Sequence, residues 1–240
     1  PKIFTITLML FGAINFGFLY CLLTGKFKRT LSWEVIIFLL FVILGTISIS
    51  VVANLSALDS LFHVVSLSSS VGYSYLPLTA FGGTGLSILT ILMLIGGCTF
   101  SMAGGIRISR IITFAKVTKN SIIALLIKEQ AITKTTKDNN ATSNGENLSS
   151  SISILLFTFT LVVLAILFTT IGVSFTDALF EVGSAITTAG ISTGVTTVTM
   201  PIFHKWIMIA AMTIGRVEVL AILLALFTIG RKSPKQTQEQ

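Results

Sequence analysis

Two short stretches of the chain combine serine or threonine with glycine in a pattern suited to holding a dehydrated cation. They are "SLSSSVGYS" from Ser66 and "AITTAGISTG" from Ala185, and neither carries a charged side chain. When such a segment runs extended, its backbone carbonyls replace the hydration shell of an ion, and glycine adopts angles that a side chain forbids. The alternative is that small residues only allow close helix packing. The candidate ion-binding residues are Ser69, Ser70, Val71, Gly72, Tyr73, Thr187, Thr188, Ala189, Gly190 and Ile191.

The two stretches belong to an internal repeat. "DSLFHVVSLSSSVGYS" from Asp59 and "DALFEVGSAITTAGIS" from Asp177 align at an offset of 118 residues and share Asp, Leu, Phe, Val, Ser, Gly and the final Ser. A repeated supersecondary unit explains such self-similarity. Because two copies stand in the same context, we favour ion binding over simple packing for both.

The elements that position these loops are membrane-spanning helices. Hydrophobic residues make up 53% of the chain and charged residues 10%, with a mean hydropathy of +0.94. A soluble domain has about 25% charged residues. Stretches without Asp, Glu, Lys or Arg each match or exceed the roughly 18 to 20 residues that cross a bilayer as a helix. Together with a fifth span that carries Arg216 and Glu218, they predict five crossings, at 3–25, 35–52, 60–106, 147–176 and 206–229.

Each copy of the repeat is too short to cross the membrane. About 12 apolar residues at ~1.5 Å per residue reach half way through a core of ~30 Å, so the segment must enter and leave on the same side. Non-helical backbone at that depth is tolerated only where it is buried in protein or lines a water-filled cavity. We expect a short helix to start near Asp59 or Asp177, because acidic residues suit a helix N-terminus, and to direct its C-terminal carbonyls inward.

The basic residues predict the orientation. Thirteen of the sixteen Lys and Arg residues fall within 26–29, 107–137 and 231–235, which the positive-inside bias places in the cytoplasm. The repeats then enter from the outer face. The net charge of +7 is explained by topology, so we expect membrane lipid and no nucleic acid as a partner. The chain begins with Pro1 and Lys2 directly at a span, which suggests part of a longer protein.

A break is expected in the long apolar run after the first loop. Gly96, Gly97, Gly104 and Gly105 surround "CTFSMA", and each costs a helix about 1 kcal/mol relative to alanine. The break would place an irregular loop, including Ser101, directly under the first candidate filter. The alternative is a tight packing face.

Arg216 is the second feature of this region, because it stands near the middle of the last span. Arginine there costs ~2.5 to 3.5 kcal/mol on insertion scales, so we expect it to face the protein interior. Its five donors could reach carbonyls of the glycine-rich loop or the carboxylate of Glu218. It would either lock that loop or set an electrostatic barrier to cations; snorkelling to an interface is the alternative.

These motifs resemble the TrkH/KtrB superfamily of potassium transport proteins. Beyond the loops, "MLIGGCTFSMAGGIRISRI" from Met93 resembles the broken inner helix of that family's third unit, and "MTIGRVEVL" from Met212 resembles the inner helix of the fourth. "GAINFGFLYCLLTGKFK" from Gly12 is similar to the cytoplasmic half of the second unit's inner helix. The resemblance implies an all-α integral membrane fold of repeated helix, pore-loop, helix units around a central ion pore.

The resemblance also implies the organisation and partners of the chain. It divides the chain into the end of the second unit's inner helix (1–30), the third unit (31–119), a cytoplasmic linker (120–150), the fourth unit (151–232) and a cytoplasmic tail (233–240). It implies a homodimer in the cell membrane with a cytosolic nucleotide-binding regulatory subunit similar to TrkA or KtrA. It makes K⁺ the transported ion, without a cofactor or a metal other than that ion. The gate would comprise Gly96, Gly97, Ser101, Gly104, Gly105 and Arg216.

Other function classes receive less support. The sequence has no phosphate-binding loop, no paired acids within a span and no metal-ligand cluster, so an enzyme is not indicated. A secondary transporter of another small solute also uses broken helices, but in inverted repeats, whereas these two repeats share one orientation. A non-conducting half-protein that needs a partner is the third possibility.

Overall fold

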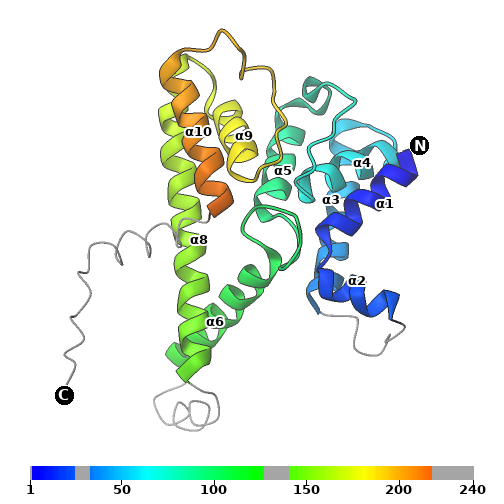
Figure 1. Cartoon of the computed structure of the whole chain (residues 1–240), viewed down its shortest axis with the longest axis vertical. Coiled ribbons are helices and arrows are strands. Elements are labelled where there is room, and N and C mark those ends of the chain that lie inside the picture. Colours follow the sequence, from blue (N-terminus) through cyan, green and yellow to red (C-terminus); the bar gives the residue numbers. More distant parts are fainter. Residues whose placement is uncertain (1, 25–32, 127–140, 218–240) are drawn as a thin grey trace, which may run out of the picture.

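The computed structural model describes residues 2–24, 33–126 and 141–217, and the described part is helical without strands. Helices α1 and α2 come first, followed by two groups that each contain a long helix, a short helix and a third helix (Figure 1). The elements are α1 (Lys2–Ala13), α2 (Phe16–Leu23), α3 (Trp33–Ala53), α4 (Ala57–Ser68), η2 (Leu78–Phe81), α5 (Gly82–Ile95), α6 (Ile108–Leu126), α8 (Ala141–Phe168), η4 (Thr169–Ile171), α9 (Phe175–Ile186) and α10 (Ile202–Val217).

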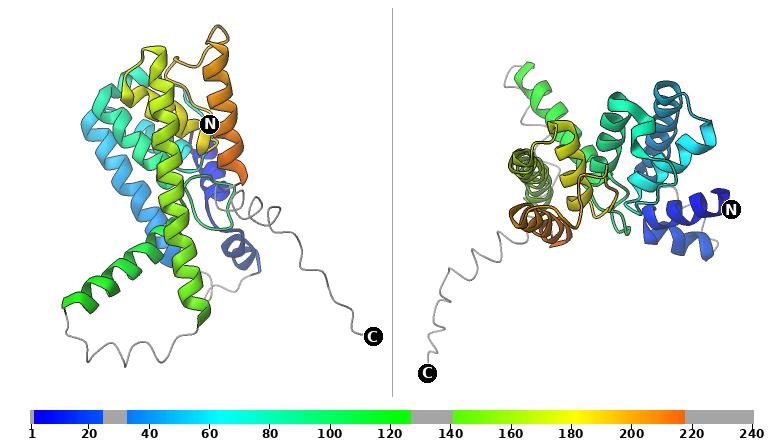
Figure 2. Two further views of the ribbon diagram at one scale, coloured as in Figure 1. Left: turned by 90° about the vertical axis from the view of Figure 1, so that its left-hand side faces the viewer. Right: turned by 90° about the horizontal axis from the view of Figure 1, so that it is seen from above.

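The two groups stand side by side. Seen from above, α8, α9 and α10 lie on one side and α3, α4 and α5 on the other, and α5 packs against α9 between them (Figure 2). We call the end that carries the N-termini of α4 and α9 the upper end, as it is drawn in Figure 1. The two short helices therefore occupy matching places in the two groups, as the sequence repeat predicts.

Several helices are long and apolar enough to cross a membrane. Among the described residues these are α3, Leu78–Ile95 and Leu148–Ile171, with α1 and α2 as a fourth span bent by 112°. The rest of the fifth predicted span, beyond Val217, lies outside the described residues. The outward side chains of α3, such as Leu40 and Ile47, are exposed, as expected for a surface in contact with lipid.

Both short helices start with a serine cap. The Oγ of Ser56 accepts a hydrogen bond from the Asp59 N–H at 3.2 Å, and the Oγ of Ser174 accepts one from the Asp177 N–H at 3.2 Å. The aspartates lie in the first turn, where a negative charge is stabilised by the helix dipole. The predicted start near each aspartate is therefore confirmed, but the capping residue is the serine three positions earlier.

Removing a cap should destabilise the protein measurably. Ser174→Ala removes the acceptor for the Asp177 N–H and is expected to lower the free energy of unfolding by about 1 kcal/mol. Thermal unfolding in detergent would measure this loss. Ser48→Ala is the matched control, because that exposed hydroxyl bonds only to the Leu44 carbonyl of its own helix. Equal stability of the two variants would contradict the capping role.

The segment before α8 differs from expectation. The sequence predicts a linker over 120–150, whereas α6 continues to Leu126 and α8 already begins at Ala141. Helix α8 starts before the apolar run of 147–176. Its polar first part contains one glycine, Gly145, so little interrupts the helix there. The unit boundaries themselves stay a prediction.

Candidate ion-binding loops and intramembrane gate

The two candidate filter loops have the same backbone. Ser70 and Thr188 have φ of +56° and +59°, and Gly72 and Gly190 have φ of +76° and +74°. The N–H groups of Val71 and Gly72 donate to the Ser66 carbonyl at 3.1 and 3.2 Å. The corresponding N–H groups of the second loop, from residues 189 and 190, donate to the Ser184 carbonyl at 3.0 and 3.4 Å. The sequence repeat is therefore a repeat of backbone geometry.

This geometry leaves carbonyl oxygens free. No hydrogen bond between described residues uses the carbonyls of 69–72 or 187–190 as acceptors. Two hydroxyls of these segments are occupied: Ser69 Oγ donates to the Ser66 carbonyl at 3.3 Å, and Thr187 Oγ1 donates to the Gly183 carbonyl at 2.8 Å. The loops thus offer carbonyl ligands, while these two hydroxyls close the ends of the short helices. Such an arrangement suits a dehydrated monovalent cation.

The two loops approach each other at Gly72. A Cβ on Gly72 would lie 1.7 Å from the carbonyl oxygen of Ala189, so no side chain fits between the loops there. A Cβ on Gly190 would meet nothing within 4 Å. Glycine is therefore required at position 72 both by the positive φ and by the close contact with the second loop, whereas at position 190 it is required by the positive φ alone. The side chains differ more than the backbone, since Val71 and Tyr73 are exposed and Ala189 and Ile191 are buried.

The predicted break in the long apolar run is present. Helix α5 ends at Ile95, α6 begins at Ile108, and the intervening segment, 96–107, forms a loop that we call the intramembrane loop. Its base is closed, because the N–H groups of Ile106 and Arg107 donate to the Leu94 and Ile95 carbonyls at 2.9 and 3.0 Å. The loop contains four of the predicted glycines and Ser101, whose Oγ donates to the Cys98 carbonyl at 2.6 Å.

The intramembrane loop contacts both candidate filters at Gly104, close to its base. The N–H of Gly104 donates to Ser70 Oγ at 3.0 Å. A Cβ on Gly104 would lie only 2.2 Å from the carbonyl oxygen of Thr187, so the loop backbone touches the start of the second filter. The sequence places the loop beneath the first filter; the structure brings it against both.

The other side of the intramembrane loop is fixed to the break between α1 and α2. The N–H of Cys98 donates to the Ala13 carbonyl at 3.0 Å, and the N–H of Phe16 donates to the Phe100 carbonyl at 3.1 Å. From α3, the carboxylate of Glu34 accepts hydrogen bonds from the Thr99 N–H and from Thr99 Oγ1, the latter at 2.7 Å. Sequence reasoning missed Glu34; an acid at the start of a 21-residue apolar helix is the signal that could have found it.

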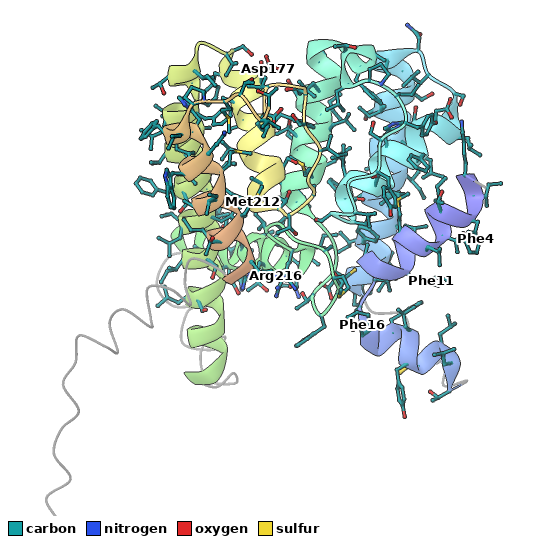
Figure 3. All side chains as sticks on the ribbon, turned by 45° about the horizontal axis from the view of Figure 1, so that its top comes forward. Phe4, Phe11, Phe16, Asp177, Met212 and Arg216 are labelled. Atoms are coloured by element: carbon teal, nitrogen blue, oxygen red, sulfur yellow. The ribbon has the colours of Figure 1, made fainter. Side chains whose placement is uncertain are left out.

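Arg216 lies close to the end of the described residues. It lies in the last turn of the described part of α10, where its side chain is exposed, at the end of the helix opposite to Asp177 (Figure 3). The expectation that Arg216 faces the protein interior stays a prediction, because its candidate partner Glu218 lies outside the described residues. The preceding residue is tightly packed, because a Cβ on Gly215 would lie 1.9 Å from the Ile186 carbonyl oxygen. That contact places this turn of α10 beside the end of α9, where the second filter begins.

The upper end carries a charge cluster that the sequence did not indicate. Lys2 Nζ lies 2.8 Å from Asp59 Oδ1, and the Tyr75 hydroxyl donates to the same oxygen. The hydrogen bond from Lys2, supported by those from Tyr75 and Ser56, lowers the pKa of the surface carboxyl of Asp59 to about 2. Asp59 therefore stays ionised throughout the physiological pH range. Lys2 also lies over the Tyr75 ring, 4.4 Å from its centroid.

Comparison with known proteins identifies the family. Residues 29–237 match the TrkH family, described as a cation transport protein. The chain belongs to the TrkH family. It is 28% identical over 229 residues to an uncharacterized cation transporter of Methanocaldococcus jannaschii, covering 95% of this chain and 48% of that protein. It is 27% identical to the Trk system potassium uptake protein TrkI of Halomonas elongata, covering 91% and 47%.

A further TrkH-family relative is the Ktr system potassium uptake protein B of Vibrio alginolyticus, 31% identical over 64% of this chain and 32% of that protein. The fold matches the crystal structure of the potassium transporter TrkH from Vibrio parahaemolyticus with a TM-score of 0.77 at 18% identity, over 94% of this chain and 51% of that one. The chain thus spans about half the length of the curated relatives from Methanocaldococcus jannaschii and Halomonas elongata. The predicted all-α fold and the position as a multi-pass protein of the cell membrane are confirmed.

Proposed function

We propose that this TrkH-family chain contributes two of the pore loops of a potassium uptake pathway, through which a dehydrated monovalent cation passes down its electrochemical gradient. The ligands are carbonyl oxygens of the first loop (Ser69, Ser70, Val71, Gly72, Tyr73) and of the second (Thr187, Thr188, Ala189, Gly190, Ile191). The observation that carries the proposal is the pairing of positive φ at both loops with carbonyls that no described donor occupies.

The direction of the repeats supports a pore more than a secondary transporter. Both short helices begin at the upper end and end inside the bundle, so both re-entrant segments enter from the same side (Figure 1). Parallel units arranged around one axis give a shared path, whereas inverted repeats favour alternating access. The residues proposed as ligands are uncharged, as in filters that select by carbonyl coordination.

The intramembrane loop is the proposed gate. Gly104 of this loop hydrogen-bonds the first filter loop and touches the second at Thr187, so the intramembrane loop lies across the inner side of both. The fold of the loop depends on its small residues. No Cβ fits without a close contact at Gly96, Gly97 or Gly105, and Ser101 Oγ bonds to the Cys98 carbonyl. We include Arg216 in the gate, because its exposed side chain lies on the turn of α10 that packs beside the second filter. Its positive charge would raise an electrostatic barrier to cations in the pore.

The partners follow from the family. The relatives are named as parts of Trk and Ktr systems, which supports a cytosolic regulatory subunit for this protein too. We propose a homodimer that docks a nucleotide-binding regulator through basic residues at the lower end, such as Lys116 and Lys119 on the exposed side of α6.

The proposal is tested by cation uptake. The gene that encodes this chain would be expressed in a bacterium that lacks its own potassium uptake systems, and rubidium and sodium uptake would be measured with and without Gly190→Ser. Strain from a side chain at φ +74° costs about 1 to 2 kcal/mol, so we expect saturable rubidium uptake whose preference over sodium falls about tenfold in the variant. Absence of uptake in the unchanged protein, or an unchanged ion preference in the variant, would contradict the role of this loop.

A further inference from the structure

Glu181 is a buried acid in α9 that the proposed pathway does not use. Its side chain is 1% exposed. Its Oε1 accepts hydrogen bonds from Ser192 Oγ at 2.7 Å, from the Thr193 N–H at 2.7 Å and from Thr193 Oγ1 at 2.8 Å. Its Oε2 accepts one from Thr196 Oγ1 at 2.6 Å. A carboxylate has about four acceptor positions, and hydrogen bonds to it are about twice as strong as those between neutral groups.

All four donors lie directly after the second filter loop. The loop is therefore held at both ends: its first part is bonded to α9 through the Ser184 carbonyl, and its exit, 192–196, is bonded to α9 through Glu181. Between these two attachments the buried Ile191 packs into the core cluster of the third unit. The carbonyls of 187–190 thus stand on a segment whose two ends have fixed positions.

The first loop lacks this attachment. The matching position in α4 is His63, whose Nδ1 contacts the Asp59 carbonyl of its own helix at 2.9 Å and whose Nε2 has no partner among the described residues. The His63 ring packs instead against Tyr75 and Phe81. The exit of the first loop is held by a neutral hydrogen bond from Ser66 Oγ to the Tyr73 carbonyl at 2.6 Å, and by the Tyr75 hydroxyl, which donates to the surface carboxylate of Asp59.

We infer that Glu181 is a positioning residue that makes the second loop the stiffer of the two, so that this loop sets the preference for potassium over the smaller sodium ion. The inference rests on the proposed function. A filter that selects by fit loses selectivity when its carbonyls can move inward to a smaller ion, and ligands keep their position only when the groups behind them are locked. Four bonds to a buried carboxylate provide that lock, whereas the first loop has one neutral bond and one bond to a surface carboxylate, which provide less.

The test compares the same substitution at matched positions of the two repeats. Glu181→Gln keeps the size of the side chain but turns an NH₂ donor toward hydroxyl and N–H donors, so we expect the rubidium-to-sodium uptake ratio to fall about tenfold. His63→Gln is the control and leaves the ratio unchanged. The ratio does not depend on how much protein reaches the membrane, so a loss of folded protein alone does not move it.

A variant on the donor side keeps the inference testable if Glu181→Gln fails to fold. Thr196→Val removes one donor while preserving shape, so it lowers the ratio by a smaller factor. Added to Glu181→Gln, it produces no further fall, because its partner is already lost. Additive effects would overturn the inference.

A readout without transport separates this inference from the proposed function. The melting temperature of the detergent-purified protein would be compared in KCl and in NaCl at equal concentration. We expect a larger stabilisation by KCl in the unchanged protein, and a smaller difference between the salts in Glu181→Gln. Equal destabilisation of the variant in both salts, with an unchanged uptake ratio, would mean a merely structural role for Glu181 and overturn the inference alone. An unchanged protein with neither rubidium uptake nor stabilisation by KCl would overturn both.

Discussion

Gly72→Ala is expected to abolish rubidium uptake, whereas Gly190→Ala keeps a measurable rate. A methyl group on Gly72 would lie 1.7 Å from the Ala189 carbonyl oxygen and 2.8 Å from its carbonyl carbon, and both are backbone atoms that cannot rotate away. The φ of +76° adds strain for any residue with a Cβ. Steric overlap and strain together cost about 3 kcal/mol, which lowers the population of the intact filter roughly a hundredfold.

The second variant separates strain from steric overlap. Gly190 has nearly the same φ, +74°, but open space where its methyl group would go, so Gly190→Ala costs about 1 kcal/mol. Initial rates of rubidium uptake, normalised to the amount of protein in the membrane, check both variants. If the two substitutions were equally harmful, the backbone angle alone would matter, and the close approach of the two loops would have no functional weight.

The internal repeat explains why so much of the filter region could be predicted. The offset of 118 residues aligns Asp59 with Asp177 and Gly72 with Gly190, and the same offset relates the helix bounds, the positive φ angles and the hydrogen bonds of the two loops. These features are local, because each bond connects residues within about six positions. Local features follow from residue type and spacing, which the sequence displays directly.

The attachments behind the loops could not be predicted in the same way. Glu34 bonds to Thr99, which is 65 residues away, and the bend of 112° between α1 and α2 comes with contacts to Cys98 and Phe100. Neither partner is visible from periodicity, because the two ends meet only after the helices have packed. Glu181 shows a different limit. Its position aligns with His63, so the alignment of the two repeats does not indicate that Glu181 bonds to the exit of its loop while His63 does not.

Arg216 illustrates a third limit. Hydropathy places it near the middle of a span and predicts a buried partner, but in the described residues its side chain is exposed. A cost of ~2.5 to 3.5 kcal/mol at the membrane centre applies to arginine facing lipid, and it is avoided where the side chain faces a water-filled path. The position of the neighbouring Gly215 against the end of α9 therefore agrees with an arginine on the pore side, a role that stays a prediction.

The second large effect is expected for Gly104→Ala, which should raise the maximal rate of rubidium uptake about fivefold without changing the ion preference. A methyl group on Gly104 would lie 2.2 Å from the Thr187 carbonyl oxygen, so the two backbones must separate. Thr187 is buried and bonded to α9 through both its N–H and its hydroxyl, whereas Gly104 belongs to the irregular loop and is only half-buried. The loop segment around Gly104 therefore moves, and it loses the bond from the Gly104 N–H to Ser70, worth about 1 kcal/mol.

A loop that blocks the path less firmly opens more often, which raises the rate, while an undisturbed filter keeps its preference. Ser70→Ala is the matched variant, because it removes the same hydrogen bond without the steric overlap and should raise the rate by a smaller factor. Uptake of rubidium and of sodium would be measured over a range of concentrations for both variants. A fall in the rubidium-to-sodium ratio would show that the filter yields instead of the loop, and unchanged rates in both variants would show that the contact between Gly104 and the filter does not control passage.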